Sequence, residues 1–143
     1  MSEDVADECV ILHALRIIGR KWMVFILSEL LMIRKGLLFS ELLKQVRGRY
    51  GEKISARMLT DSLNILEEQG IVERTIIQEK PIRVEYSLTE KGYDLEVVFG
   101  ALKGWGVRWG DVKYKKCGSF TCIHNAVKAI DLDQAMKLLY TGG

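Results

Sequence analysis

The stretch that decides the fold runs from Ile54 to Gly70 and reads ISARMLTDSLNILEEQG. Its leucines recur at helical spacing and form one apolar stripe: Leu59, Leu63 and Leu66. Ser55 stands where a side-chain oxygen can accept a hydrogen bond from the first turn, and Gly70 stands where a glycine typically ends a helix. The pattern predicts a helix that buries its leucines and exposes its other face.

The exposed face of this predicted helix carries side chains that form hydrogen bonds: Arg57, Thr60, Asp61 and Asn64. These side chains are of the types that reach base edges in the major groove of DNA. A helix with the core on one side and such side chains on the other is what a recognition helix needs. An ordinary solvated amphipathic helix has the same pattern, so the flanking sequence has to distinguish the two.

The charges are distributed unevenly, although the net charge of the 143-residue chain is only +2. The first eight residues are acidic, whereas residues 44–57 carry a clear excess of positive charge. The basic side chains of this segment, opposed only by Glu52, are Lys44, Arg47, Arg49, Lys53 and Arg57. A basic segment leading into a candidate recognition helix is an electrostatic footprint for phosphate. A solvated loop is the alternative.

Nothing in the sequence indicates export or a membrane. The N-terminus is acidic and lacks the basic segment that precedes the apolar part of a signal peptide. The apolar run from Trp22 to Ile33 is too short to span a bilayer and is interrupted by Ser28 and Glu29. Three cysteines, an odd number, fit a reducing compartment. We therefore expect a cytoplasmic protein with no membrane partner.

Three further helices are predicted upstream, over about residues 8–18, 21–33 and 39–46. The first, which Asp7 or Glu8 can open, is apolar on nearly all sides, so it has to be buried in a core or against another subunit. Gly48 and Gly51 are expected to bracket the turn before the helix that starts at Ser55. Two helices joined by a short turn containing glycine form a helix-turn-helix.

A β-hairpin is predicted over residues 71–88, directly after the helix. Residues 71–77 are rich in β-branched side chains, and residues 82–88 alternate between apolar and polar. The polar turn between them holds Pro81, the only proline of the chain. We expect one face of the hairpin to be buried, because a hairpin of this size is not stable alone. The predicted fold class is mainly α with a small β-hairpin wing, a winged helix-turn-helix.

A long helix is predicted to follow the hairpin, beginning at Thr89 and Glu90 and continuing to about residue 109. Its apolar and aromatic stripe has little core left to cover in so small a domain. The stripe therefore suggests a partner surface, most simply a second copy of the chain. Packing back onto its own domain is the alternative. Residues 110–143 differ in composition and are predicted to hold a last short helix beginning at Asp131.

The chain resembles the HxlR-type transcriptional regulators, and several segments agree in order and spacing over about residues 9–109. These segments are Cys9…Ala14-Leu15…Ile18-Gly19…Lys21-Trp22, Phe39-Ser40-Glu41-Leu42, Ile54-Ser55…Met58-Leu59-Thr60…Leu63…Leu66-Glu67…Gly70-Ile71-Val72…Arg74 and Pro81-Ile82-Arg83-Val84-Glu85-Tyr86-Ser87-Leu88-Thr89-Glu90-Lys91-Gly92. Two positions depart from the family's usual pattern: Arg20 replaces a glycine and Val10 replaces a proline. Neither position lies in the proposed reading helix.

The resemblance implies a winged-helix fold related to the MarR group and a homodimer joined through terminal helices. Recognition helix 55–69 would enter the major groove, and wing 71–88 would lie along the backbone or minor groove. A two-fold dimer would then read a palindromic operator. By position, the implied base-reading residues are Ser55, Arg57, Thr60, Asp61 and Asn64. The expected backbone contacts are Arg47, Arg49, Lys53, Lys80 and Arg83. An acidic neighbour that holds Arg83 for the shape of the wing is a rival role for that residue.

Cys9 is a candidate redox sensor, because some members of the family sense oxidants or electrophiles through a cysteine at this position. A helix N-terminus favours a thiolate, whereas the adjacent negative charges of Asp7 and Glu8 oppose it. A buried cysteine that acts as a small hydrophobe is the alternative. A disulfide from Cys9 to a cysteine in the tail, Cys117 or Cys122, stays open. With His124 these two would supply only three ligands, so no metal site is expected.

The sequence thus predicts three parts: a flexible acidic N-terminus (1–8), an HxlR-like DNA-binding and dimerisation domain (9–109) and a C-terminal extension (110–143). The first hypothesis is a homodimeric, sequence-specific regulator of transcription, with repression as the expected mode. The second makes DNA binding the output of a thiol sensor at Cys9. The third is a winged-helix module that binds proteins and has lost DNA. No nucleophile–base pair or phosphate-binding loop supports an enzyme, and no cofactor or small-molecule effector is indicated.

Overall fold

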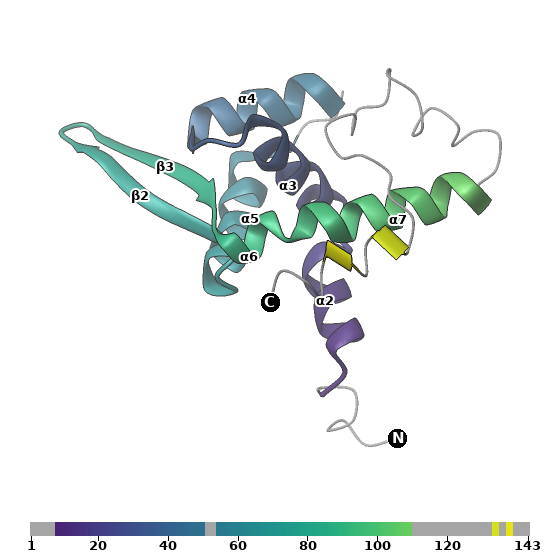
Figure 1. Ribbon diagram of the computed structural model, residues 1–143. Helices are drawn as coiled ribbons and strands as arrows, with labels where there is room; N and C mark the ends of the chain where they lie inside the picture. Colours follow the sequence, from purple (N-terminus) through teal and green to yellow (C-terminus); the bar gives the residue numbers. More distant parts are fainter. Residues whose placement is uncertain (1–7, 51–53, 110–132, 135–136, 139–143) are drawn as a thin grey trace.

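The structure, a computed structural model, describes residues 8–50, 54–109, 133–134 and 137–138 (Figure 1). The elements in chain order are α2 (Val10–Ile18), α3 (Lys21–Ile33), β1 (Leu37–Leu38), α4 (Phe39–Tyr50), α5 (Ala56–Glu68), β2 (Val72–Glu79), β3 (Ile82–Leu88), α6 (Glu90–Tyr93) and α7 (Leu95–Trp109). The helix predicted from Asp131 lies largely outside the described residues, of which 133–134 and 137–138 are helical.

The core lies where α3, α4 and α5 meet beneath the base of the sheet. The apolar stripe predicted for α5 is confirmed, because Leu59, Leu63 and Leu66 are each 0 % exposed. They pack with buried residues of α3 and α4, among them Ile26 and Leu42. Burying a leucine completely contributes about 1.5–3 kcal/mol, so this stripe supplies much of the energy that holds α5 in place.

Both ends of α5 match the prediction within one residue. Ser55 is the N-cap, and its Oγ accepts a hydrogen bond from the backbone N–H of Met58 at 3.0 Å. After the helix, Gly70 adopts a left-handed conformation with φ +70°, which favours glycine. The N–H of Ile71 then donates to the carbonyl of Leu66 at 2.9 Å, closing the helix end.

Helix α4 is longer than predicted, because it continues past Val46 to Tyr50. The expectation that Gly48 lies in the turn before α5 is therefore wrong. Glycine costs a helix interior only about 1 kcal/mol relative to alanine. Arg47 and Arg49 extend from this last part of α4 to contacts with neighbouring elements, and these contacts favour the helical extension. Both arginines thus lie on a helix rather than in a loop.

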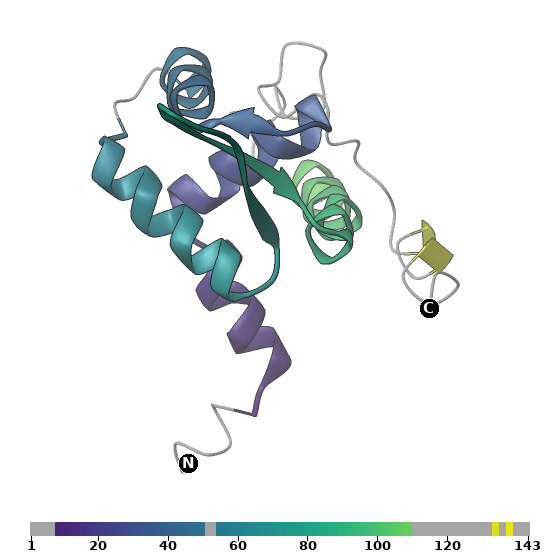
Figure 2. The same cartoon turned by 90° about the vertical axis from the view of Figure 1, so that its left-hand side faces the viewer.

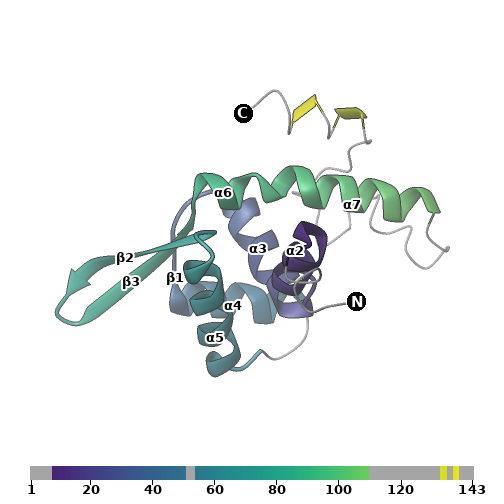
Figure 3. The same cartoon turned by 90° about the horizontal axis from the view of Figure 1, so that it is seen from below.

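The hairpin predicted over residues 71–88 forms, and a short strand that the sequence analysis missed joins it. The sheet order is β1-β3-β2, with Leu37 opposite Tyr86 in the register. The prediction that one whole face of the hairpin is buried was wrong, because only the base of the wing is covered. Leu88 at the base is 7 % exposed, whereas Ile82 near the tip is 69 % exposed. Figure 3 shows β2 and β3 projecting from the helical body, on the side away from the far end of α7.

The helix predicted after the wing is divided into two pieces, α6 and α7, at Asp94. Thr89 caps the first piece as expected, and its Oγ1 accepts from the N–H of Gly92 at 3.2 Å. The backbone of Asp94 bonds to a carbonyl four residues earlier, but Val97 bonds to the carbonyl of Asp94, only three residues earlier. This tighter turn separates the pieces, and it follows Gly92, a poor helix former.

Apolar side chains of α2 and α7 stay exposed in the single chain. The N-terminal helix begins at Val10 rather than at residue 7 or 8, and its first turns project from the body (Figure 2). Only the C-terminal end of α2, at Ile17 and Ile18, is buried in the chain's own core. Val10 at its start is 78 % exposed. On α7, Trp109 is 69 % exposed. Among the described residues, no helix has the length and apolarity that crossing a membrane requires.

Candidate nucleic-acid interface

The solvent face of α5 brings together all the residues predicted to read bases. Their side chains are exposed and alternate along the helix with the buried leucines: Ser55, Arg57, Thr60, Asp61 and Asn64. Two of these side chains already serve the helix itself. Ser55 caps it, and the hydroxyl of Thr60 donates to the carbonyl of Ala56 at 2.9 Å. The side chains of Arg57, Asp61 and Asn64 form no hydrogen bond or ion pair with other described residues, so they are the freest to form hydrogen bonds with a ligand.

The C-terminal end of α5 is held against the wing and α6. The hydroxyl of Thr89 donates to the carbonyl of Gly70 at 2.5 Å, and Lys91 Nζ donates to the carbonyl of Gln69 at 2.5 Å. The carbonyl of Ile71 also accepts from the N–H of Thr89 at 3.0 Å. These bonds tie the end of α5 to the start of β2 and to α6. A ligand would therefore meet α5 and the base of the wing as one unit.

The two arginines near the end of α4, Arg47 and Arg49, form contacts that add a structural role to the phosphate contacts predicted from the sequence. Arg47 Nε donates to the carbonyl of Ile54 at 2.9 Å, directly before α5. Arg49 forms an ion pair with Glu29 of α3. The outer nitrogens of a guanidinium can still donate to phosphate when Nε is engaged. Lys53 lies outside the described residues.

Glu29 is a buried charged residue that the sequence analysis treated only as an interruption of an apolar run. Its side chain is 0 % exposed, and the side chain of its partner Arg49 is 36 % exposed. A buried carboxylate is tolerated only where a positive charge or several hydrogen bonds compensate it. The signal available in the sequence was the position of Glu29, which falls on the apolar face of the helix 21–33.

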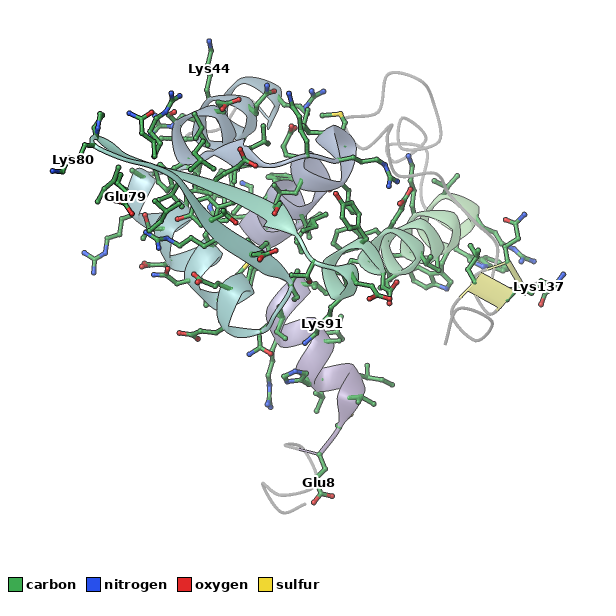
Figure 4. All side chains as sticks on the ribbon, turned by 60° about the vertical axis from the view of Figure 1, so that its left-hand side comes forward. Glu8, Lys44, Glu79, Lys80, Lys91 and Lys137 are labelled. Carbon is green, nitrogen blue, oxygen red and sulfur yellow. The ribbon has the colours of Figure 1, made fainter. Side chains whose placement is uncertain are left out.

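The wing carries its predicted basic residues at the tip. Figure 4 shows Lys80 at the end of the hairpin, next to Glu79, with Lys44 pointing away from α4. Gln78 Nε2 donates to the carbonyl of Lys80 at 3.1 Å, which stabilises the turn. Arg83 is exposed and pairs with Gln78 in the strand register. In the part of the chain that the structure describes, no acidic neighbour holds Arg83 in an ion pair.

Cys9 is the N-cap of α2 and is a free, half-buried thiol. Its carbonyl accepts from the N–H of His13 at 3.0 Å, while its side chain forms no capping hydrogen bond. The thiol therefore stands at the N-terminal end of a helix, as expected from its position. Asp7, Cys117 and Cys122 lie outside the described residues. Within the residues described, no cluster of three side chains could hold a metal ion.

The fold and the site define a class of protein. A helix-turn-helix whose second helix exposes polar side chains, followed by a β-hairpin wing, is the architecture of winged-helix transcriptional regulators. Residues 17–114 match the model of the HxlR-like helix-turn-helix family, and the chain belongs to this family. Its fold and its relatives are those of transcriptional regulators of helix-turn-helix type, not of enzymes.

Curated and solved relatives agree with this assignment. The chain is 34% identical over 101 residues to YvaP, a helix-turn-helix regulator of Bacillus subtilis, covering 71% of this chain and 87% of YvaP. A MarR-family regulator from Enterococcus faecalis V583 has a similar structure, with a TM-score of 0.61 and 31% identity over 80% of this chain and 94% of the other. The oxidised redox regulator HypR matches with a TM-score of 0.56 and 36% identity, covering 73% of this chain and 100% of HypR.

Proposed function

We propose that this chain is a homodimeric repressor that binds a specific DNA sequence through α5. The observation that carries the proposal is the face of α5, where Arg57, Asp61 and Asn64 are exposed opposite a fully buried leucine stripe. Arginine and asparagine can each form two hydrogen bonds with one base in the major groove. A dimer bound at an operator would exclude other proteins from that DNA, which is the simplest route to repression.

The exposed apolar surfaces of α2 and α7 support the dimer. Val10 and Ile11 of α2 are 78 % and 68 % exposed, and Trp105 of α7 is 64 % exposed. Large exposed apolar surface is rare on a monomer and typically marks an interface. A two-fold dimer would present two copies of α5, which suit a palindromic operator with half-sites about one helical turn apart.

Phosphate contacts would supply most of the affinity. The candidates are the basic residues that flank α5 in sequence or lie on the wing: Arg47, Arg49, Lys53, Lys80 and Arg83. Four of them are exposed, and Lys53 lies outside the described residues. Each neutralised phosphate releases counterions, so binding should weaken steeply as salt increases. Because Arg49 is paired with Glu29, we expect it to contribute less direct contact than the other four.

The test is fluorescence anisotropy of the full chain with labelled DNA from upstream of its own gene. Titrations at 50 mM and 200 mM salt, in competition with random DNA, separate specific from general binding. We expect the upstream fragment to compete at least a hundredfold better than random DNA and its affinity to fall with salt. If it competes no better, selection of bound fragments from the whole genome decides between a distant operator and a module that binds proteins instead of DNA.

Replacing Arg57 by alanine is expected to weaken operator binding about tenfold and to relax preference at one base position. One well-formed base contact from arginine accounts for about 1–3 kcal/mol of discrimination. The measurement is the same anisotropy titration, repeated on operators with single base changes. Arg20→Ala is the matched control, because Arg20 is exposed between α2 and α3 and its loss removes the same charge. Equal affinity of wild type and Arg57→Ala would show that this face does not read DNA.

A second candidate function, thiol sensing, is favoured by the position of Cys9. This free thiol stands at the N-terminus of α2, beside the apolar surface proposed for dimerisation. A solved relative is described as a redox regulator in its oxidised form. Oxidation of Cys9 would then change the dimer and, through it, the affinity for DNA.

Cys9→Ser is expected to leave basal operator affinity within twofold of wild type and to abolish its change on treatment with diamide. Serine keeps the size of the side chain and can cap the helix, but it cannot be oxidised to a disulfide. Anisotropy titrations before diamide, after diamide and after added reductant measure the response. A full response in Cys9→Ser would remove Cys9 from the sensing mechanism and leave the DNA-binding function intact.

A further inference from the structure

Arg34 ends α3 in a backbone conformation that is unusual for its residue type. Its φ is +58° and its ψ is +27°, in the left-handed region. It is the only non-glycine residue with positive φ among those described. Glycine normally occupies such positions at helix ends because a Cβ atom is disfavoured there. Something other than local backbone preference must therefore favour arginine at this position.

The side chain of Arg34 connects the end of α3 to the start of α7. Its Nη2 forms an ion pair with Oε2 of Glu96, which lies 62 residues later in the first turn of α7. Its guanidinium carbon lies 5.9 Å from the ring centre of Tyr93 at the end of α6. One side chain thus bridges the helical body and both helices that follow the wing. We name these three residues, Arg34, Tyr93 and Glu96, the α7 latch.

The latch lies at the junction between α6 and α7. The two helices meet at Asp94, which keeps a helical backbone conformation although the hydrogen bonding tightens for one turn, so α7 runs on from α6 and its base lies beside the latch. Phe99 anchors the first half of α7 in the core at 8 % exposure, while Trp105 and Trp109 of the second half are 64 % and 69 % exposed. Figure 1 shows this second half extending away from the body. The contact at Glu96 therefore restrains the tilt of the projecting part.

A small tilt of α7 at its base would move its far end by a distance comparable to the spacing of base pairs in DNA. α7 has 15 residues, so it is about 22 Å long. A rotation of about 10° at its base would move its far end by about 4 Å, close to the 3.4 Å rise of one base-pair step. In a dimer joined through α7, two-fold symmetry would tilt α7 by the same angle in both subunits. The spacing between the two copies of α5 would then shift by about one base pair or more.

We propose that the α7 latch is a positioning device that sets the spacing between operator half-sites. The proposal rests on the proposed function, since it needs a dimer that binds DNA. Arg34 and Glu96 contact no DNA in this scheme and act only through the direction of α7. The alternative is a surface ion pair of the ordinary kind, which would contribute little to any property.

The test is a series of operators in which the two half-sites are moved apart or together by one or two base pairs. Wild type, Arg34→Gly and Glu96→Gln are titrated on each operator, and thermal unfolding is followed in parallel. Arg34→Gly removes the latch and also relieves the left-handed backbone, so the variant keeps its fold. Lys35→Ala is the matched control, because Lys35 is the adjacent exposed cation. The exchange variant, Arg34→Glu with Glu96→Arg, restores an ion pair of reversed polarity.

We expect wild type and Lys35→Ala to prefer one spacing over its neighbours by tenfold or more. In Arg34→Gly and Glu96→Gln this preference should fall at least threefold, while the midpoint temperature of unfolding stays within about 2 °C of wild type. The exchange variant should recover the preference. Identical spacing profiles for wild type and both single variants would overturn the latch and leave the proposed function standing. Failure of wild type to bind any operator of the series better than random DNA would overturn the proposed function itself.

Discussion

Replacing Gly92 by valine is expected to destabilise the folded domain by about 3 kcal/mol. Gly92 is buried in α6, and a Cβ atom there would clash with the carbonyl oxygen of Ile71 and lie 2.9 Å from Cδ2 of Leu88. The carbonyl cannot easily move, because it accepts a hydrogen bond from the N–H of Thr89 at 3.0 Å. Overpacking of this kind typically costs 1–3 kcal/mol or more, and valine adds two further methyl groups.

Urea unfolding followed by circular dichroism measures the loss. Gly48→Ala is the matched control, because a Cβ atom at Gly48 would meet nothing within 4 Å on the exposed side of α4. This variant should be stabilised by about 0.5–1 kcal/mol, since alanine favours a helix over glycine. A Gly92→Val variant within 1 kcal/mol of wild type would mean that the contact between α6 and the start of β2 is looser than the structure indicates.

The fold was largely predictable because its main elements have strong local signals. In α5 the cap, the leucine period and the terminal glycine all agree, and each acts within one or two helical turns. In α3 the apolar period alone was a sufficient signal, and in the hairpin the strand pattern and the single proline of the turn agree. Where local signals agree with one another, tertiary contacts only need to confirm them.

The errors arose where long-range contacts decide the structure. β1 is only Leu37–Leu38, too short for any period, and it exists because it pairs with β3 about fifty residues away. α4 passes through Gly48, which local preference alone places in a turn. The exposed wing tip differs from the prediction for a similar reason. Alternation in residues 82–88 shows which side chains share a face, but not how far the body extends beneath them.

In the candidate site, too, local features could be predicted from the sequence and long-range contacts could not. The polar face of α5 could be found from the sequence, because exposure there follows directly from the buried leucine period. The ion pair of Glu29 with Arg49 and the α7 latch join residues far apart in the chain, so no spacing rule indicates either partner. The sequence indicated only that single charged residues stand at unusual positions, such as a glutamate on the apolar face of α3.

Replacing Arg49 by alanine is expected to destabilise the domain by about 2 kcal/mol and to weaken DNA binding mainly through that loss of stability. Glu29 is 0 % exposed, so removing its partner leaves a negative charge in the core with less compensation. Breaking a buried pair costs about 3–5 kcal/mol, and the smaller value expected here reflects the 36 % exposure of the Arg49 side chain.

A double-mutant cycle isolates the pair. Glu29→Gln removes the charge and keeps the shape, so Arg49→Ala should cost much less in that background than in wild type. Lys44→Ala, which removes an exposed charge from the same helix (Figure 4), is the control and should change stability by less than about 0.5 kcal/mol. If Arg49→Ala keeps wild-type stability but loses operator affinity, Arg49 is a phosphate contact, as the sequence first predicted. Loss of stability with the coupling to Glu29 would instead show that this arginine holds α4 and α3 together, next to α5.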